Sequence, residues 1–177
     1  MLSDIVSREH SYMVRLLVIL DDILHNLKSE EPVDYKVVAE IIHYLQRHSE
    51  QTHHPKEDII YHYYLEHYGE SEKIANLALA HSELAQVTRE FSDLVEMVNN
   101  DAVVPNDVCY QALAHFIHQQ KKHLDFEERE ILPQLKKMFT AQDWQQVEKL
   151  WGEENKDPLF GSDIENDYAK LQALISQ

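Results

Sequence analysis

The chain has 177 residues, which is enough for one domain with a sizeable hydrophobic core. Its 16 basic and 32 acidic residues give a formal net charge of −16, so a nucleic-acid partner and an anionic membrane surface are both unfavourable. Only 3 glycines and 5 prolines argue against a β-sandwich or barrel, and the single cysteine, Cys109, excludes an internal disulfide. The apolar run at 16–20 is too short to span a bilayer. We therefore expect a soluble, cytoplasmic, all-helical protein, in which the 12 histidines need a reason.

Apolar residues recur at helical spacing along most of the chain, and they predict four long helices of roughly 25 to 30 residues, each about 40 Å long. The first begins at Ser3, a favourable N-cap, and ends just before Pro32. The second begins near Asp34 and ends at Gly69. Because Pro55 removes a helical hydrogen bond and clashes with the preceding turn, we expect a kink there, or a break and restart.

The third and fourth helices follow after short connections. The third opens near Ser71, and the fourth begins at Asn106 or Asp107. Pro133 is expected to bend the last turns of the fourth helix. Short connections favour antiparallel neighbours, so residues 1–138 are predicted to form an all-α, antiparallel up-down-up-down four-helix bundle.

Residues 139–177 are predicted to extend the bundle with further helices. Thr140 and Asp143 come close to a capping box and start a helix that runs to about Trp151. A last amphipathic helix carries four apolar residues, Ile164, Tyr168, Leu171 and Leu174. No low-complexity linker separates these parts, so we expect one domain over 1–177.

Polar side chains interrupt the apolar stripe of each long helix. They are His10; His53 with Glu57; His81; and His123 with Glu127. A histidine and a glutamate four residues apart lie on one helix face, so both His-x-x-x-Glu pairs point to the same interior. A lone histidine in a core is often a hydrogen-bonded structural residue, and an intrahelical pair is often solvated. Four histidines and two glutamates at one level of a core are too costly without compensation, and bound cations explain them better.

Imidazole and carboxylate donors together suit iron, manganese or zinc. Two ions about 3.5 to 4 Å apart are the usual geometry of a two-metal site. We therefore expect Glu57 and Glu127 to bridge two ions. Helix adjacency assigns the histidines in two pairs, His10 with His53 and His81 with His123.

The order of these residues resembles the hemerythrin-like (HHE cation-binding) domain family. The motifs that carry the resemblance are His10, His53-His-Pro-Lys-Glu57-Asp58, His81 and His123-Leu-Asp-Phe-Glu127-Glu128, and they extend over residues 1 to about 138. The resemblance implies an antiparallel four-helix bundle that holds a non-haem di-iron centre with an oxo or hydroxo bridge. It also implies a small diatomic ligand, O2 or NO, or the sensing of iron or redox state.

The third helix departs from the pattern of the oxygen-carrying hemerythrins, which have His-x-x-x-His there. The residues four away from His81 are Leu77 and Ala85, so one imidazole is missing. Related domains use the residue after the first histidine of the second helix as a ligand, which makes His54 an additional candidate. A centre with fewer histidines leaves open coordination positions for O2, NO, peroxide or water.

The remaining histidines are expected outside the centre. His62 and Glu66 form a third His-x-x-x-Glu pair, but His62 lies about half a turn out of phase with His53. We expect this pair at the surface unless Pro55 resets the phase. The other histidines expected at the surface or rim are His25, His43, His48, His67, His115 and His118.

Three functional hypotheses follow from these residues. The histidine-rich ligand set favours a di-iron protein that binds O2 or NO, or reports iron or redox state. The open coordination positions favour a di-iron oxidoreductase acting on peroxide or NO, or an iron–sulfur cluster repair protein. The extra C-terminal helices and the tyrosines at 61–64 favour an interaction module, and a homodimer is left open. Ferritin-like oxidase chemistry is less favoured, because Gln120 stands where a second copy of the Glu50-x-x-His53 unit would need glutamate.

Overall fold

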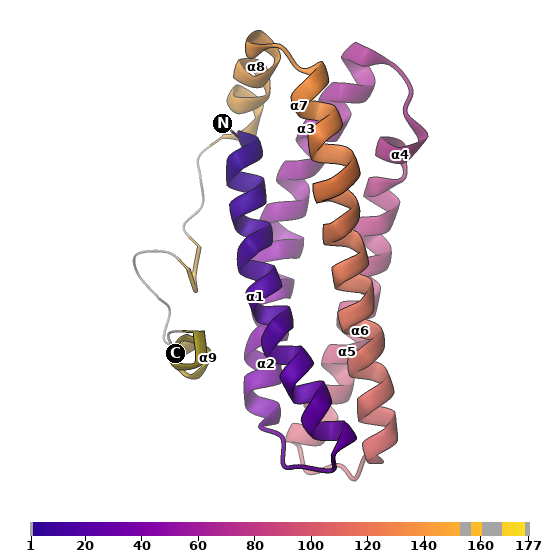
Figure 1. Ribbon diagram of the computed structural model, residues 1–177, viewed down its shortest axis with the longest axis vertical. Helices are drawn as coiled ribbons and strands as arrows, with labels where there is room; N and C mark the ends of the chain where they lie inside the picture. Colours follow the sequence, from indigo (N-terminus) through magenta and orange to yellow (C-terminus); the bar gives the residue numbers. More distant parts are fainter. Residues whose placement is uncertain (1, 153–156, 161–167, 176–177) are drawn as a thin grey trace.

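The computed structural model describes residues 2–152, 157–160 and 168–175, and these residues form helices and turns with no strand among them. Figure 1 shows the chain passing along the long axis of the molecule four times and reversing its direction at each end. The prediction of an all-α bundle of long helices is therefore confirmed.

The helices follow one another along these four passes. The first pass is α1 (Leu2–Lys28). The second consists of α2 (Tyr35–Tyr44), η1 (Leu45–His53) and α3 (His54–Tyr68). The third consists of α4 (Glu72–Ala75) and α5 (Leu77–Asn99). The fourth consists of α6 (Asn106–Phe126), η2 (Glu127–Ile131) and α7 (Leu132–Met138). Two shorter helices, α8 (Ala141–Trp151) and α9 (Ala169–Ile175), complete the chain.

Side-chain amides join the ends of neighbouring passes. Nδ2 of Asn106, at the start of α6, donates to the carbonyl of Leu27 near the end of α1 over 2.8 Å. Nδ2 of Asn99, at the end of α5, donates to the carbonyl of Tyr35 at the start of α2 over 3.2 Å. These contacts tie the start of one pass to the end of another and hold the lower end of the bundle in Figure 1 together.

Helix starts agree with the predicted capping residues in two of three cases. The carboxylate of Asp34 accepts from the backbone N–H of Lys36, as an N-cap does. Thr140 and Asp143 form a complete capping box at the start of α8. The predicted N-cap Ser3 is wrong, because α1 already includes Leu2, whose side chain is buried in the core and holds the first turn by packing.

Pro55 and Pro133 each lie two residues after the end of a stretch of π-helix. Such wide turns pair an N–H with the carbonyl five residues back: the N–H of His54 bonds to Ser49, and the N–H of Leu132 bonds to Glu127. Pro55 and Pro133 then fall in the first turn of α3 and α7, where a missing N–H costs least. Instead of a sharp kink at Pro55, the structure has a segment of π-helix before it. Both π-helical segments contribute residues to the polar layer described below.

The sequence predicted one continuous helix for the third pass, but the structure divides this pass into two helices. Ser71 does precede its first helical residue, but α4 lasts for a single turn and α5 begins anew after Asn76. Ile74 of this short helix is buried against the upper part of the bundle. Burial of Ile74 thus stabilises the single turn of α4. The apolar pattern of the sequence, which continues without a break, did not predict this interruption.

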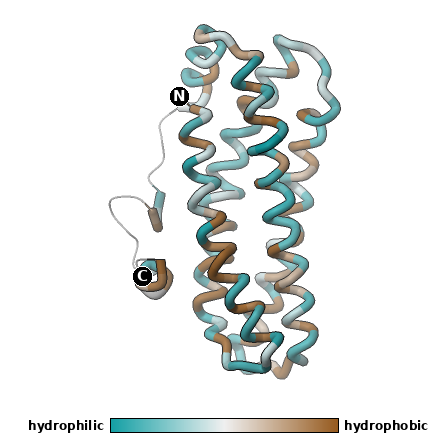
Figure 2. The backbone as a smooth tube through the Cα atoms, viewed as in Figure 1, coloured by the Kyte–Doolittle hydropathy of each residue, from teal (hydrophilic) through white to brown (hydrophobic). Residues whose placement is uncertain are grey.

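Two groups of buried apolar side chains lie along the bundle, one on each side of a polar layer. The lower core includes Leu16, Leu20, Ile41, Phe91 and Phe116. The upper core includes Val6, Ile60, Ile74, Ile131 and Leu135. Figure 2 shows hydrophobic residues alternating with hydrophilic ones along the long helices. Because burying each large apolar side chain contributes roughly 1.5 to 3 kcal/mol, the two cores stabilise the bundle and fix the helix positions at the layer between them.

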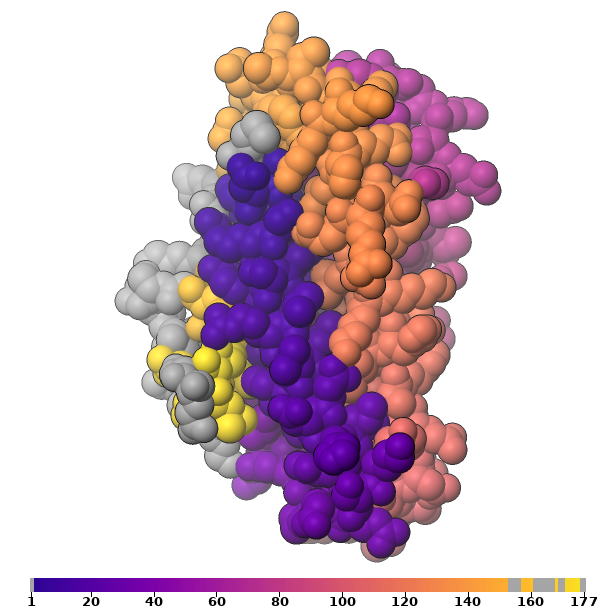
Figure 3. All heavy atoms as spheres, in the orientation of Figure 1, coloured from indigo at the N-terminus to yellow at the C-terminus, as the bar shows by residue number. Residues whose placement is uncertain are grey.

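The C-terminal helices pack on the outside of the bundle. Figure 3 shows α9 against its flank, where it contacts α2, while α8 contacts α3 at the upper end. Leu159, Tyr168 and Leu171 are buried there. The predicted apolar position Ile164 lies outside the described residues. None of the helices in the described part is both long and apolar enough to cross a membrane.

Candidate metal centre

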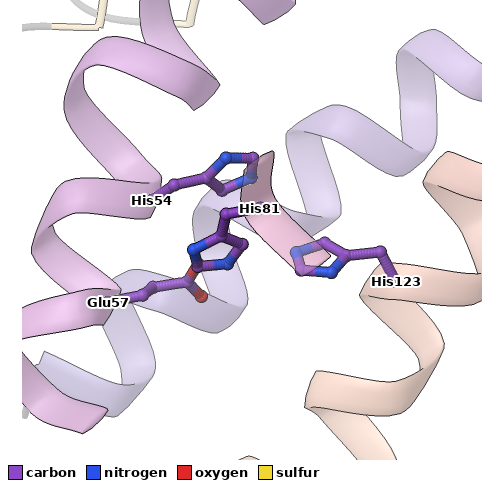
Figure 4. A group of neighbouring side chains, drawn as sticks. All are labelled: His54, Glu57, His81 and His123. Atoms are coloured by element: carbon purple, nitrogen blue, oxygen red, sulfur yellow. The ribbon is translucent and has the colours of Figure 1, made fainter. Parts of the chain in front are cut away.

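All seven candidate ligands meet in the middle of the bundle, and all are buried. They come from α1 (His10), η1 (His53), α3 (His54 and Glu57), α5 (His81), α6 (His123) and η2 (Glu127). Figure 4 shows four of these side chains reaching toward one another from three helices. Every pass of the bundle thus contributes at least one imidazole to one layer.

The Glu57 carboxylate lies between three imidazoles. Its Oε1 is 3.1 Å from Nε2 of His10 and 3.3 Å from Nε2 of His53. Its Oε2 is 3.6 Å from Nε2 of His81. One carboxylate therefore faces histidines from three different passes, one oxygen on each side.

Glu127 occupies an equivalent position on the fourth pass. Its Oε2 is 3.2 Å from Nε2 of His123 and 3.5 Å from Nε2 of His10. Its Oε1 is 3.4 Å from Nε2 of His81. The two glutamates thus share His10 and His81 as neighbours, although they come from different helices.

The donor atoms form two groups, within each of which they lie no more than 4.8 Å apart. One group is His10, His53 and Glu57; the other is His54, Glu57, His81 and His123. The division separates the histidines into the same pairs that helix adjacency suggested, and it adds His54 to the second pair. Glu57 belongs to both groups, which is the position of a carboxylate that could bridge two ions.

Three more carboxylates hold the outer nitrogens of these rings. Nδ1 of His53 donates to Glu9 over 2.5 Å, Nδ1 of His10 to Glu128 over 2.8 Å, and Nδ1 of His81 to Asp58 over 3.0 Å. The hydrogen bond from Nδ1 fixes the orientation of each ring, so that Nε2 points to the centre and is the nitrogen left to bind a metal. This is the usual arrangement around a metal-ligating histidine. Sequence reasoning did not give these carboxylates a role, although each is the neighbour in sequence of a candidate ligand.

Tyr61 is a second residue whose position the sequence did not reveal. It is buried, and its hydroxyl donates to Oε1 of Glu127 over 2.7 Å. Its place, one turn after Glu57 on α3, brings the phenol to the same layer. The interaction role that the sequence suggested for the tyrosines at 61–64 missed this contact.

Several polar atoms of the layer have no hydrogen-bond partner among the described residues. They are Nε2 of His53, His81 and His123, and Oε2 of Glu57 and Glu127. Leaving a buried polar atom unpaired costs about 1 to 3 kcal/mol, so such atoms need an explanation. All of them face the interior of the layer and all are of metal-ligating types, and bound cations would satisfy them together.

The charges of the metal-free layer are set by its own carboxylates. Burial opposes the charged form of His10, but hydrogen bonds to Glu128 and Glu57 outweigh it and raise its pKa to about 10. Despite burial, the charge of Glu57 raises the pKa of His53 to about 9. Despite burial, the hydrogen bond to Asp58 and the nearby charges of Glu57 and Glu127 raise the pKa of His81 to about 10. These rings hold protons that a metal cation would have to displace.

His54 behaves differently from the other rings. Burial, together with the nearby positive charge of His81, lowers its pKa well below the usual value. Its ring stacks on that of His81, with centroids 4.2 Å apart and planes 5° from parallel. A neutral imidazole is the form that ligates a metal, so His54 fits the extra role that the sequence proposed for it.

The remaining histidines lie outside the layer, with one correction. His62 is exposed, and its Nδ1 donates to the carbonyl of Asp58 over 2.6 Å. The expectation that His48 is exposed is wrong: it is buried in η1, with Nε2 3.4 Å from Oδ2 of Asp157. The wide turns of η1 change the helical phase, and the C-terminal segment covers this ring. Neither change is visible in an ordinary helical pattern.

The geometry leads to the comparison with known proteins. The family model described as the hemerythrin HHE cation binding domain matches residues 1–135. The chain belongs to this family. No curated protein and no solved structure matches it.

The central layer lies within the matched region. The matched region ends within α7, so it contains the first three passes, most of the fourth and every candidate ligand. The family name describes a cation-binding domain, and the buried histidine and glutamate clusters could hold a metal ion. Helices α8 and α9 lie beyond the matched residues.

Proposed function

We propose that this HHE domain holds two iron ions in its central layer and binds O2 or NO there, or reports iron or redox state. The observation that carries the proposal is the pair of donor groups that share Glu57. Each of the two overlapping groups could hold one ion, with Glu57 between the two. Iron bound in this layer would supply a redox couple and coordination positions for a small ligand.

Each residue has a role that its position supports. His10 and His53 would hold one ion, and His54, His81 and His123 would hold the other. Glu57 and Glu127 would lie between the ions and offset part of their charge. The outer carboxylates fix the rings in place, and the two apolar cores exclude water from both ends of the layer.

Iron is proposed rather than zinc or manganese because the family is typically an iron binder, while the donor set alone suits all three metals. The test is anaerobic loading with ferrous iron, followed by iron counting and absorption spectra before and after exposure to O2 or NO. The proposal expects about two bound ions per chain and a spectral change on gas addition. Iron uptake near zero would contradict the proposal, and spectra insensitive to both gases would contradict gas binding and leave only the sensing role.

The chain contains its own matched control for this experiment. Glu57→Ala removes the carboxylate shared by both donor groups, and Glu66→Ala removes the exposed glutamate of the His62 pair. Both changes delete a glutamate of α3 that follows a histidine by four residues. We expect the first to abolish binding of at least one ion and the second to leave the iron count unchanged.

An oxidoreductase acting on peroxide or NO is the second candidate, and Tyr61 favours it. The phenol is buried, and its O–H lies 2.7 Å from a candidate ligand, where it can offer a proton to a reacting molecule. Turnover of peroxide or NO by the iron-loaded chain, lost in Tyr61→Phe with the iron count unchanged, would support this role. Stoichiometric binding without turnover would support the binding or sensing role instead.

A further inference from the structure

A pocket between α5 and α6 leads from the surface to the central layer. Its volume is about 370 Å³, and His123 forms part of its wall. His123 is also the most exposed of the candidate ligands, at 8%. The layer is closed off by the two apolar cores along the bundle axis, so this pocket is a lateral approach to it.

The pocket is much larger than a diatomic molecule requires. A cavity of about 150 Å³ is enough to bind benzene, and pockets for small organic ligands begin at roughly 300 Å³. At about 370 Å³, this pocket falls within that second range. Its size therefore fits a small organic molecule as well as a gas.

The walls of the pocket are mainly apolar, with the partly buried amide of Gln119 among them, and its mouth is charged. Ala80, Leu84 and Val87 line it from one stripe of α5, and Phe126 lines it from α6. Glu83 and Lys122 are exposed lining residues of opposite charge, and no ion pair within the described part of the chain involves either. Opposite charges at one opening cancel at a distance, so they select neither anions nor cations.

We propose that this pocket binds a small, uncharged, mainly apolar organic molecule, with its inner end against His123. The apolar body would lie along the stripe of α5 and against Phe126, while a polar group would face Glu83 and Lys122. Binding itself needs only the fold. The inference rests on the proposed metal centre in one respect, namely that the bound molecule would then lie beside an ion held by His123.

Ala80 is the residue that keeps the pocket open at its upper end. It is the smallest side chain of the α5 stripe and is only partly buried, so a larger side chain there would enter the pocket instead of the core. Ala80→Phe should therefore fill the pocket. Ala78→Phe places the same side chain two residues away, at an exposed position that does not line the pocket, and is the matched control.

The test uses the full chain, metal-free and zinc-loaded, titrated with indole as an uncharged bicyclic probe. Magnetic resonance of the His123 ring and of the Phe126 backbone reports where the probe binds. We expect saturable shifts at both residues in the unmodified chain. We expect Ala80→Phe to weaken indole binding by about tenfold or more, while Ala78→Phe leaves it unchanged.

Two further measurements keep the outcomes separate. Val87→Phe fills the other end of the pocket and replaces Ala80→Phe if that variant fails to fold, as judged by circular dichroism. Absence of saturable shifts at His123 in the unmodified chain, or full-strength binding to a folded pocket-filling variant, overturns the proposal. Metal counting on the same samples tests the metal centre independently, since indole binding without metal uptake would leave the pocket standing and the proposed function refuted.

Discussion

The Glu9 carboxylate accepts a hydrogen bond from Nδ1 of His53 over 2.5 Å and so ties α1 to η1 at the central layer. The contact leaves Nε2 of His53 directed at Oε1 of Glu57, 3.3 Å away. His10, the next residue after Glu9, faces the same oxygen. Two adjacent residues of α1 thus act on the centre in different ways, one through its own ring and one through the ring of another helix.

We predict that Glu9→Ala lowers the affinity for zinc by about 10- to 100-fold without preventing folding. The reason is that the His53 ring loses the partner that fixes its orientation. Competition with a chromogenic chelator measures the affinity, and Glu66→Ala, an exposed glutamate outside the layer, is the control. Equal zinc affinities for Glu9→Ala and the unmodified chain would show that the carboxylate does not position the ring.

The metal-free protein should lose stability as pH rises above neutrality. The pKa values of His10 and His81 are about 10 in the folded chain, against 6.5 for an unperturbed histidine. A group whose folded pKa is raised stabilises the fold fully below pH 6.5, and this contribution disappears as pH rises through the folded pKa. Urea midpoints in chelator should therefore fall between about pH 6.5 and pH 10. A midpoint as high at pH 9 as at pH 6 would contradict the assignment.

The carboxylates of the layer should make the metal-free protein less stable at low pH. Burial alone would raise the pKa of Glu57, but the charges of His53 and His10 lower it well below its usual value of 4.5. Its stabilising contribution is present above pH 4.5 and is lost as pH falls through the lowered pKa. The metal-free fold should thus be most stable in the mildly acidic range, between the ordinary pKa values of glutamate and histidine.

Metal affinity should depend on pH in the opposite direction. Each protonated ring must release a proton before its Nε2 can bind a cation, so affinity rises with pH. Because the pKa of His53 is about 9 and that of His10 about 10, the rise should continue well beyond pH 7. Calorimetry in buffers of different ionisation enthalpy should detect proton release on zinc binding at pH 7. Binding with no net proton release would contradict this account.

The C-terminal helix should contribute to stability through a single buried face. Leu171 is completely buried against the bundle, whereas Leu174 on the same helix is 42% exposed. Leu171→Ala should cost about 2 to 5 kcal/mol of unfolding free energy, and Leu174→Ala no more than about 0.5 kcal/mol. Chemical denaturation measures both. Similar values for the two variants would mean that α9 does not pack as described.

Helical phase placed six of the candidate ligands on inward faces, while His54 came from the family resemblance. His53 with Glu57 and His62 with Glu66 have the same spacing, yet the first pair is buried in the layer and the second is exposed. The difference follows from the half turn between them, which is a property of the sequence. The same periodicity placed His10, His81 and His123 on the inner faces of their own helices.

Other features could not be read from an ideal helical period. The wide turns of η1 change the direction of His48, and its burial depends on Asp157, more than a hundred residues away in the chain. The outer carboxylates could have been suspected, since Glu9, Asp58 and Glu128 each adjoin a candidate ligand in sequence. Their actual partners are on other helices, however, and only the packed bundle shows which ring each one holds.

Anomalous scattering at the iron edge from iron-loaded crystals tests the central claim most directly. The account predicts two peaks about 3.5 to 4 Å apart on either side of Glu57, each within bonding distance of the histidines in its donor group. A map with no peak in this layer, or with peaks only at exposed histidines such as His62, would contradict it.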